Sequence, residues 1–244
     1  MARQVLEELA KYGVTGDVVR VVDHDVKPGV EVDMGDGDEW PAIRAQMKAA
    51  DILIVATPTW VGHMSSVAQR VLERLDGELS ETDDSGRPLI TGKVAVTAVV
   101  GNEDGAHKIT ADLMQGLNDM AFTIPAQGGT YWNDVAMGSR DYQDLDETPE
   151  AVASTTATMA ENAAALARAL KGSPYPSSWP PLRRPAPRRP PTARRPPAAR
   201  APAARAAGRP RRGGRARPRC RRRPPSSGSV RTCRRRPPRR SPER

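Results

Sequence analysis

A continuous apolar run, Ile52-Leu53-Ile54-Val55, which directly follows Asp51, constrains the fold of this chain more than any other feature. An unbroken run of this kind is typical of a parallel strand that is buried on both faces, because a half-exposed strand alternates apolar and polar residues. Apolar residues then recur at helical spacing, at Val67, Val71, Leu72 and Leu75. The stretch in between, residues 57–64, is therefore predicted to be a strand-to-helix loop at the carboxyl edge of a sheet, where open α/β sheets bind ligands.

The rest of the first 172 residues alternates predicted helices with predicted strands. Strands are expected at 17–22, 51–55, 93–100 and 122–126, and helices around 5–9, 40–50, 67–75, 108–121 and 148–171. This alternation predicts an α/β fold with a doubly wound parallel sheet. Residues 23–39 are acidic and Gly-rich, but their spacing does not match a calcium-binding loop, so a solvated loop is expected there.

The distribution of charge divides the chain into two parts. Residues 1–172 hold 14 Lys and Arg against 28 Asp and Glu, whereas residues 173–244 hold 24 Arg and 18 Pro with a single Glu. The second composition buries too little apolar surface to offset the entropy of ordering. We therefore predict a folded domain over residues 1–172 and a disordered Pro/Arg-rich tail over residues 173–244.

The tail has two interpretations. An Arg-rich segment binds nucleic-acid phosphates without sequence specificity when it carries no aromatic platform for bases. Alternatively, the tail is a translation of GC-rich DNA in the wrong reading frame, and we favour this second interpretation.

Cysteine usage and hydropathy indicate a soluble cytoplasmic protein. Cys220 and Cys233 both lie in the tail, so no disulfide is expected in the folded part. No run approaches the roughly 20 apolar residues that span a bilayer. Glu7 and Glu8 stand where a signal peptide would be apolar, and no membrane association is expected.

Three predicted loops would meet at the carboxyl edge of the sheet, over residues 57–64, 101–107 and 127–133. In the first loop, Pro58 keeps Thr57 extended and Gly62 permits close approach of the backbone. Trp60 offers a flat apolar face, and Thr59 adds a second hydroxyl, which together suit a planar heteroaromatic ring. An ordinary loop with Trp60 as a packing residue is an equally weighted alternative on these residues alone.

The other two loops are less specific. Gly101 and Gly105 resemble a phosphate cradle, but Glu103 and Asp104 between them would repel an anion, so this loop suits the edge of a ring. The aromatic pair in Gly128-Gly129-Thr130-Tyr131-Trp132 is expected either to form a wall of the site or to pack in the core or an interface.

No metal site and no catalytic side chain are predicted. His24, His63 and His107 are scattered and have no cysteine partners, which argues against zinc. No grouping of Ser, His and Asp resembles a nucleophile elbow.

Four segments together resemble the flavodoxin-like NAD(P)H-dependent FMN reductases: residues 56–62, 99–107, 117–119 and 128–132. The resemblance covers residues 1–172. It implies a flavodoxin-like fold, FMN as the cofactor and NAD(P)H as the co-substrate, with hydride transfer through FMN to a quinone, a flavin or another small acceptor. It also implies a homo-oligomer. Because the flavin supplies the chemistry, no side chain need act as an acid or base.

The resemblance further implies the residues that contact the flavin. They are Thr57, Pro58, Thr59, Trp60, Val61, Gly62, His63, Gly101, Asn102, Gly105, Tyr131 and Trp132. Thr59, Trp60 and Gly62 are expected to contact the isoalloxazine ring, with Trp60 beside its face. The loops that begin at Gly101 and Gly128 are expected to close over the ring.

The sequence departs from this family at its amino end. Family members begin with a strand and a Ser/Thr/Gly-rich loop that binds the FMN phosphate at the start of the first helix, whereas this sequence starts inside that helix. In the strand order 2-1-3-4-5, the first strand lies between the strands expected at 17–22 and 51–55. We therefore expect the native start to lie about twenty to thirty residues upstream, enough for one strand and one loop.

Two other functions stay open at this point. One is a flavodoxin-type electron carrier that uses no pyridine nucleotide. The other, from a different class, is a nucleic-acid-binding protein that acts through its Arg-rich tail. An FMN reductase turns over NADH or NADPH, whereas the electron carrier does not. Removal of residues 173–244 should abolish nucleic-acid binding if the tail is the functional part, and it should leave flavin-dependent activity unchanged.

Overall fold

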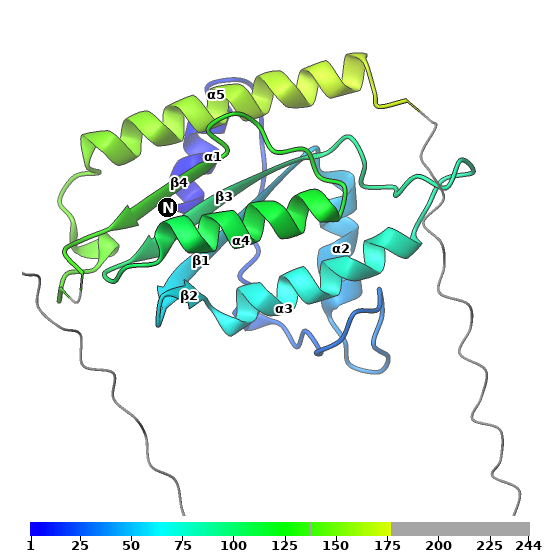
Figure 1. Ribbon diagram of the computed structural model, residues 1–244, viewed down its shortest axis with the longest axis horizontal. Helices are drawn as coiled ribbons and strands as arrows, with labels where there is room; N and C mark the ends of the chain where they lie inside the picture. Colours follow the sequence, from blue (N-terminus) through cyan, green and yellow to red (C-terminus); the bar gives the residue numbers. More distant parts are fainter. Residues whose placement is uncertain (137, 177–244) are drawn as a thin grey trace, which may run out of the picture. The chain divides into compact units, whose positions relative to one another are not determined.

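The computed structural model describes residues 1–136 and 138–176 (Figure 1). The helices are α1 (Ala2–Ala10), α2 (Trp40–Ala49), α3 (Ser66–Leu75), α4 (Ala106–Asp119) and α5 (Glu150–Gly172). The strands are β1 (Ile52–Trp60), β2 (His63–Met64), β3 (Val94–Gly101) and β4 (Gly129–Asn133). Single 3-10 turns form at Val21–Asp23, Asp76–Ser80 and Tyr142–Asp144. Within this described part, no helix is both long and apolar enough to cross a membrane. The tail predicted from residue 173 lies, beyond Pro176, outside the described residues.

The four strands form one sheet in the order β2-β1-β3-β4. Strand β1 pairs in parallel with β3 from Ile52↔Val94 to Pro58↔Val100, and β4 adds in parallel on the far side of β3. The short β2 pairs antiparallel with the end of β1. The carboxyl ends of β1, β3 and β4 therefore lie at one edge of the sheet, and the predicted doubly wound α/β class is confirmed.

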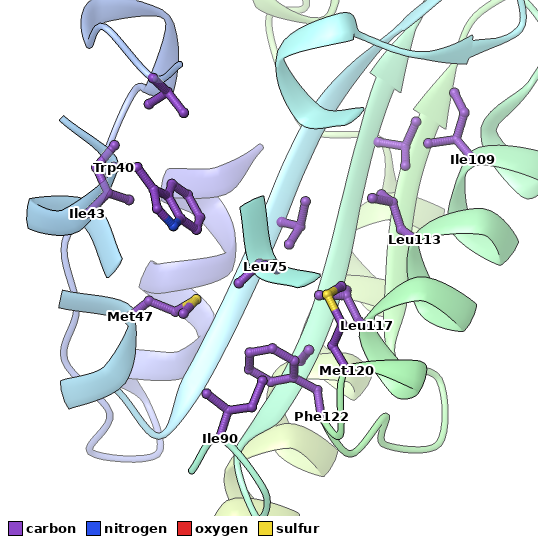
Figure 2. Close-up of a cluster of buried hydrophobic side chains, with 14 of the residues drawn as sticks. Trp40, Ile43, Met47, Leu75, Ile90, Ile109, Leu113, Leu117, Met120 and Phe122 are labelled. Carbon is purple, nitrogen blue, oxygen red and sulfur yellow. The ribbon is translucent and has the colours of Figure 1, made fainter. Parts of the chain in front are cut away.

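Helices cover both faces of the sheet (Figure 1). Helices α2, α3 and α4 pack on one face through a cluster that includes Trp40, Leu75 and Leu113, which Figure 2 shows in close-up. Helices α1 and α5 pack on the other face through small residues of α5 such as Ala163 and through Leu9. All of Val94–Val99 is buried, as expected for a strand enclosed on both faces.

The strand predicted at residues 17–22 is wrong. Residues 14–20 run without regular structure and Val21–Asp23 forms a 3-10 turn. Val18 is 43 % exposed and Val22 is 65 % exposed. A strand exists only when a neighbour pairs with its backbone groups, and no described segment pairs with this stretch. The outer edge of β1 is likewise unpaired over Ile52–Ala56 within the described residues.

The strand predicted at residues 122–126 is reduced to one isolated bridge, Val94↔Thr123. Pro125 has no N–H to donate to a ladder, and Gln127 has a positive φ of 56°. Pairing with β3 resumes only at Gly129, where a Cβ would lie 2.8 Å from Thr97 Oγ1. The stretch predicted as the third loop is therefore largely strand β4.

The acidic segment before α2 is fixed by a buried ion pair. Arg74 donates to both carboxylate oxygens of Asp38, at 2.9 and 2.7 Å, and neither side chain is exposed to solvent. Arg74 also donates to the carbonyls of Lys27 and Glu31, and its guanidinium lies 5.5 Å from the centre of the Trp40 ring. The expectation of a solvated loop is thus wrong at Asp38, because α3 supplies a cation that sequence spacing does not reveal.

We expect the Asp38→Asn substitution to destabilise the fold by about 3 kcal/mol, because it leaves the buried Arg74 charge without its partner. Urea unfolding measures this difference. The matched control is Asp112→Asn in the pair with Lys108, where the side chains are 46 % and 50 % exposed; its effect is expected to stay within about 0.5 kcal/mol. Equal effects of the two substitutions would contradict the assigned role of Asp38.

The same pair predicts a pH dependence. The Arg74 guanidinium holds the pKa of the Asp38 carboxyl well below its usual range. A lowered pKa in the folded state stabilises the fold above the unfolded pKa of about 3.9, and this contribution is lost as the pH falls below that value. Urea midpoints measured from pH 7 to pH 3 should fall more steeply below about pH 4 for the native sequence than for Asp38→Asn. Parallel curves would show that Asp38 titrates normally.

Candidate functional site

The end of β1 turns back into β2 through a two-residue hairpin loop, Val61-Gly62. Both residues have positive φ angles, 53° and 71°, which is the geometry of a type I′ turn. The His63 Nδ1–H donates to the Val61 carbonyl at 2.8 Å. We call Trp60, Val61 and Gly62 the hairpin tip. The side chains of Trp60 and Val61 are 61 % and 85 % exposed, so the hairpin tip presents apolar surface to solvent.

The loop after β3 lies directly against the hairpin tip. A Cβ on Gly105 would lie 2.8 Å from both the Cα and the carbonyl oxygen of Gly62, so only glycine fits this backbone contact. The Val61 N–H donates to Glu103 Oε1 at 2.9 Å. Two loops that the sequence presents 40 residues apart thus form one structural unit at the carboxyl edge.

Side chains at the end of β1 alternate between buried and exposed positions, and this alternation divides the predicted residues of the first loop into two groups. Thr57 and Thr59 are buried, at 4 % and 5 % exposure, whereas Pro58 and Trp60 face outward. Thr57 Oγ1 accepts from the Ser65 N–H at 3.1 Å and so anchors the start of α3. The face available at this edge therefore consists of Pro58, Trp60 and backbone groups, and it does not include the threonine hydroxyls.

The predicted aromatic pair of β4 divides between the two faces of the sheet. Trp132 is 6 % exposed and packs on Tyr142, with ring centres 5.4 Å apart, which agrees with the alternative of a core aromatic. Tyr131 points to the other face and shares a 2.9 Å hydrogen bond with His107 Nε2. Their rings meet edge to face at 4.9 Å, beside a cavity of about 190 Å³ that also reaches Asn133.

Two further predicted residues have structural partners. A Cβ on Gly101 would lie 2.6 Å from the Cβ of Thr59, so this glycine allows β1 and β3 to approach at their ends. Asn102 Nδ2 donates to Asp141 Oδ1 at 3.2 Å. Sequence reasoning missed His107 as a site residue, although its position directly after Gly105-Ala106 at the start of a helix was a usable signal.

The arrangement at this edge suits a flat, uncharged ring. Trp60 offers an exposed indole, and Gly62 and Gly105 allow close backbone approach. Glu103 and Asp104 make this part of the edge acidic, which disfavours a phosphate group there. The exposed apolar surface and the glycine contact are the features that a planar cofactor ring needs.

A doubly wound α/β sheet with its candidate site on the carboxyl ends of parallel strands defines a flavodoxin-like protein. Residues 1–137 match the NADPH-dependent FMN reductases, and the chain belongs to this family. The predicted family is thereby confirmed, and FMN is the cofactor that this family model indicates.

Several known proteins are similar to this chain. The 8-demethyl-8-aminoriboflavin-5'-phosphate synthase of Streptomyces davaonensis is 32 % identical over 131 residues, which are 50 % of this chain and 51 % of that protein. The divalent metal cation transporter MntH of Mycobacterium bovis is 35 % identical over 128 residues, 51 % of this chain and 19 % of that protein. The crystal structure of RosB with bound 8-demethyl-8-formylriboflavin-5'-phosphate superposes with a TM-score of 0.63 at 29 % identity, over 71 % of this chain and 73 % of that one. The chain thus spans about half and about a fifth of the length of the two curated relatives.

The residues present fit the ring of FMN. The contact between Gly62 and Gly105 is a cradle that any Cβ would fill, and Trp60 lies exposed beside it.

Substitution Gly105→Ala is expected to push the hairpin tip away from the loop and to weaken FMN binding at least tenfold, about 1.4 kcal/mol. Titration of the protein into FMN, followed by flavin fluorescence, measures the affinity. Gly86→Ala is the matched control, because Gly86 also has a positive φ, 80°, but has nothing within 4 Å of an added Cβ. If both substitutions weakened FMN binding equally, the loop contact would have no role in the site.

Proposed function

We propose that this protein binds FMN at the carboxyl edge of β1 and β3 and transfers a hydride from NAD(P)H through FMN to a small acceptor such as a quinone or a free flavin. The observation that carries the proposal is the exposed Trp60 on a hairpin tip held against Gly105, in a member of the FMN reductase family. The nicotinamide loses two electrons, and the acceptor gains them as a hydride together with a proton from solvent.

The proposed roles follow from the geometry. Trp60 lies beside the face of the ring, Gly62 presents backbone groups to its edge, and Gly105 keeps the opposite loop close. Tyr131 and His107 line the neighbouring cavity, where a second planar molecule can enter. When bound, FMN supplies the ring that accepts and donates the hydride, so the side chains orient it and exclude water.

The phosphate of FMN is proposed to lie near the first turn of α1. The first N–H groups of a helix have no intrahelical partners and favour anions. Tyr142, which packs on Trp132 at the end of β4, donates to Gln4 Oε1 at 2.6 Å. This contact supports the proposal, because it brings the start of α1 to the same edge of the sheet as the hairpin tip.

The acidic residues of the edge bear on the choice of acceptor. Glu103 and Asp104 lie next to the proposed ring site, and like charges repel across a partly desolvated gap. We therefore propose a neutral electron acceptor rather than an anionic one. The homo-oligomer and the exact acceptor stay predictions.

The purified chain with added FMN is expected to oxidise NADPH or NADH when a neutral quinone is present, as measured by the loss of absorbance of the nicotinamide. Trp60→Ala should lower kcat/KM about tenfold, because a stacked aromatic is worth about 1 kcal/mol or more. The matched control is Tyr175→Ala, an exposed aromatic that bonds to Thr123 away from the carboxyl edge. Absence of turnover with both nucleotides would overturn the proposal and favour an electron carrier.

A further inference from the structure

Val61 is held in a conformation that a β-branched residue avoids. Its φ is +53°, in the left-handed region, and the first position of a type I′ turn normally carries Asn, Asp or Gly. A backbone conformation of this kind is strained and persists only where the surrounding structure holds it. The Val61 side chain is 85 % exposed, so its packing does not offset the strain. The compensation must come from the backbone of this residue.

The Val61 N–H provides that compensation through its hydrogen bond to Glu103 Oε1, 2.9 Å long. A distance of 2.9 Å is the normal value for an N–H···O hydrogen bond, so this oxygen satisfies the amide donor. Glu103 is half-buried and takes part in none of the ion pairs formed among the described residues. The hydrogen bond to the Val61 N–H is therefore the interaction that the Glu103 carboxylate makes among the described residues.

Two other contacts fix the same turn from different sides. His63 holds the Val61 carbonyl, and Gly62 rests on Gly105. Both of these contacts limit where the turn can move, but neither one binds the Val61 amide. Strand pairing of Trp60 with His63 holds this peptide unit on the β2 side, and the hydrogen bond that Glu103 accepts from the Val61 N–H holds it on the side of the loop after β3.

We propose that Glu103 is a positioning residue for the flavin site: by accepting the Val61 N–H it fixes the peptide unit between Trp60 and Val61, and with it the indole that faces the ring. The consequence for FMN binding rests on the function proposed above. Glu103 acts through Val61 and transfers no proton. The role needs an acceptor oxygen at this place, and it does not need a negative charge.

Two substitutions of Glu103 separate the effect of the acceptor oxygen from the effect of the negative charge. Glu103→Gln keeps an acceptor oxygen of the same reach, whereas Glu103→Ala removes it and frees the turn to leave the left-handed region. A freed turn must be ordered again when the ring binds, which lowers the affinity. Asp84→Ala is the matched control, because it removes one exposed carboxylate from the connection before β3, away from the carboxyl edge.

The first measurement is hydrogen exchange of the Val61 amide, followed by NMR on the full chain without flavin. We expect exchange to be at least tenfold faster in Glu103→Ala and close to the native rate in Glu103→Gln and Asp84→Ala. The Val96 amide, in the fully buried part of β3, reports on the fold and should not change. Unchanged Val61 exchange in Glu103→Ala would overturn the proposal.

The second measurement is FMN affinity. We expect about tenfold weaker binding in Glu103→Ala, equivalent to about 1.4 kcal/mol, and less than threefold loss in Glu103→Gln and Asp84→Ala. If Gln behaved as Ala, charge rather than the acceptor oxygen would be the cause, and the proposal would be wrong. If the native chain bound no FMN while the exchange results held, the proposed function would fail and the positioning of the hairpin tip by Glu103 would stand.

Discussion

The parallel backbone pairing of β1 with β3 is the constraint on which the rest of the structure depends. In its register, from Ile52↔Val94 to Pro58↔Val100, the carboxyl ends of both strands lie next to each other at the same edge of the sheet. The loops that follow then meet within hydrogen-bonding distance, as the contact of Val61 with Glu103 shows. A shift of one residue would turn every side chain to the opposite face, and would place the threonines of β1 where Trp60 now lies.

The helices that cover the two faces of the sheet are held in place by different interactions. On the side of α1 and α5, small residues such as Ala160 and Ala164 allow the long helix to lie close to the strands. On the other side, α3 carries Arg74 inward to hold the acidic segment before α2. The buried Arg74 guanidinium donates hydrogen bonds to two backbone carbonyls of this segment, which has no strand pairing among the described residues. It thereby satisfies backbone groups that strand pairing satisfies within the sheet.

Much of the fold could be predicted from the sequence, and so could the edge of the sheet at which the loops after β1 and β3 meet, because both follow from local patterns. The unbroken apolar runs identified β1 and β3, and the glycines identified where loops approach. What failed depended on partners distant in sequence: residues 17–22 have no strand to pair with among the described residues, and Asp38 is buried only because Arg74 reaches it. Tyr131 and Trp132 were predicted either to form a wall of the site or to pack in the core or an interface, and strand alternation sends the two rings to opposite faces.

The unpaired outer edge of β1 has a consequence for how this chain behaves in solution. Over Ile52–Ala56 this edge pairs with no other strand among the described residues, and Ile52, Leu53 and Ile54 are half-exposed beside it. Open apolar edges are templates for intermolecular strand pairing, so we expect self-association along this strand to increase with protein concentration. A lysine placed at this edge would oppose such association through charge and hydration while leaving the pairing with β3 intact.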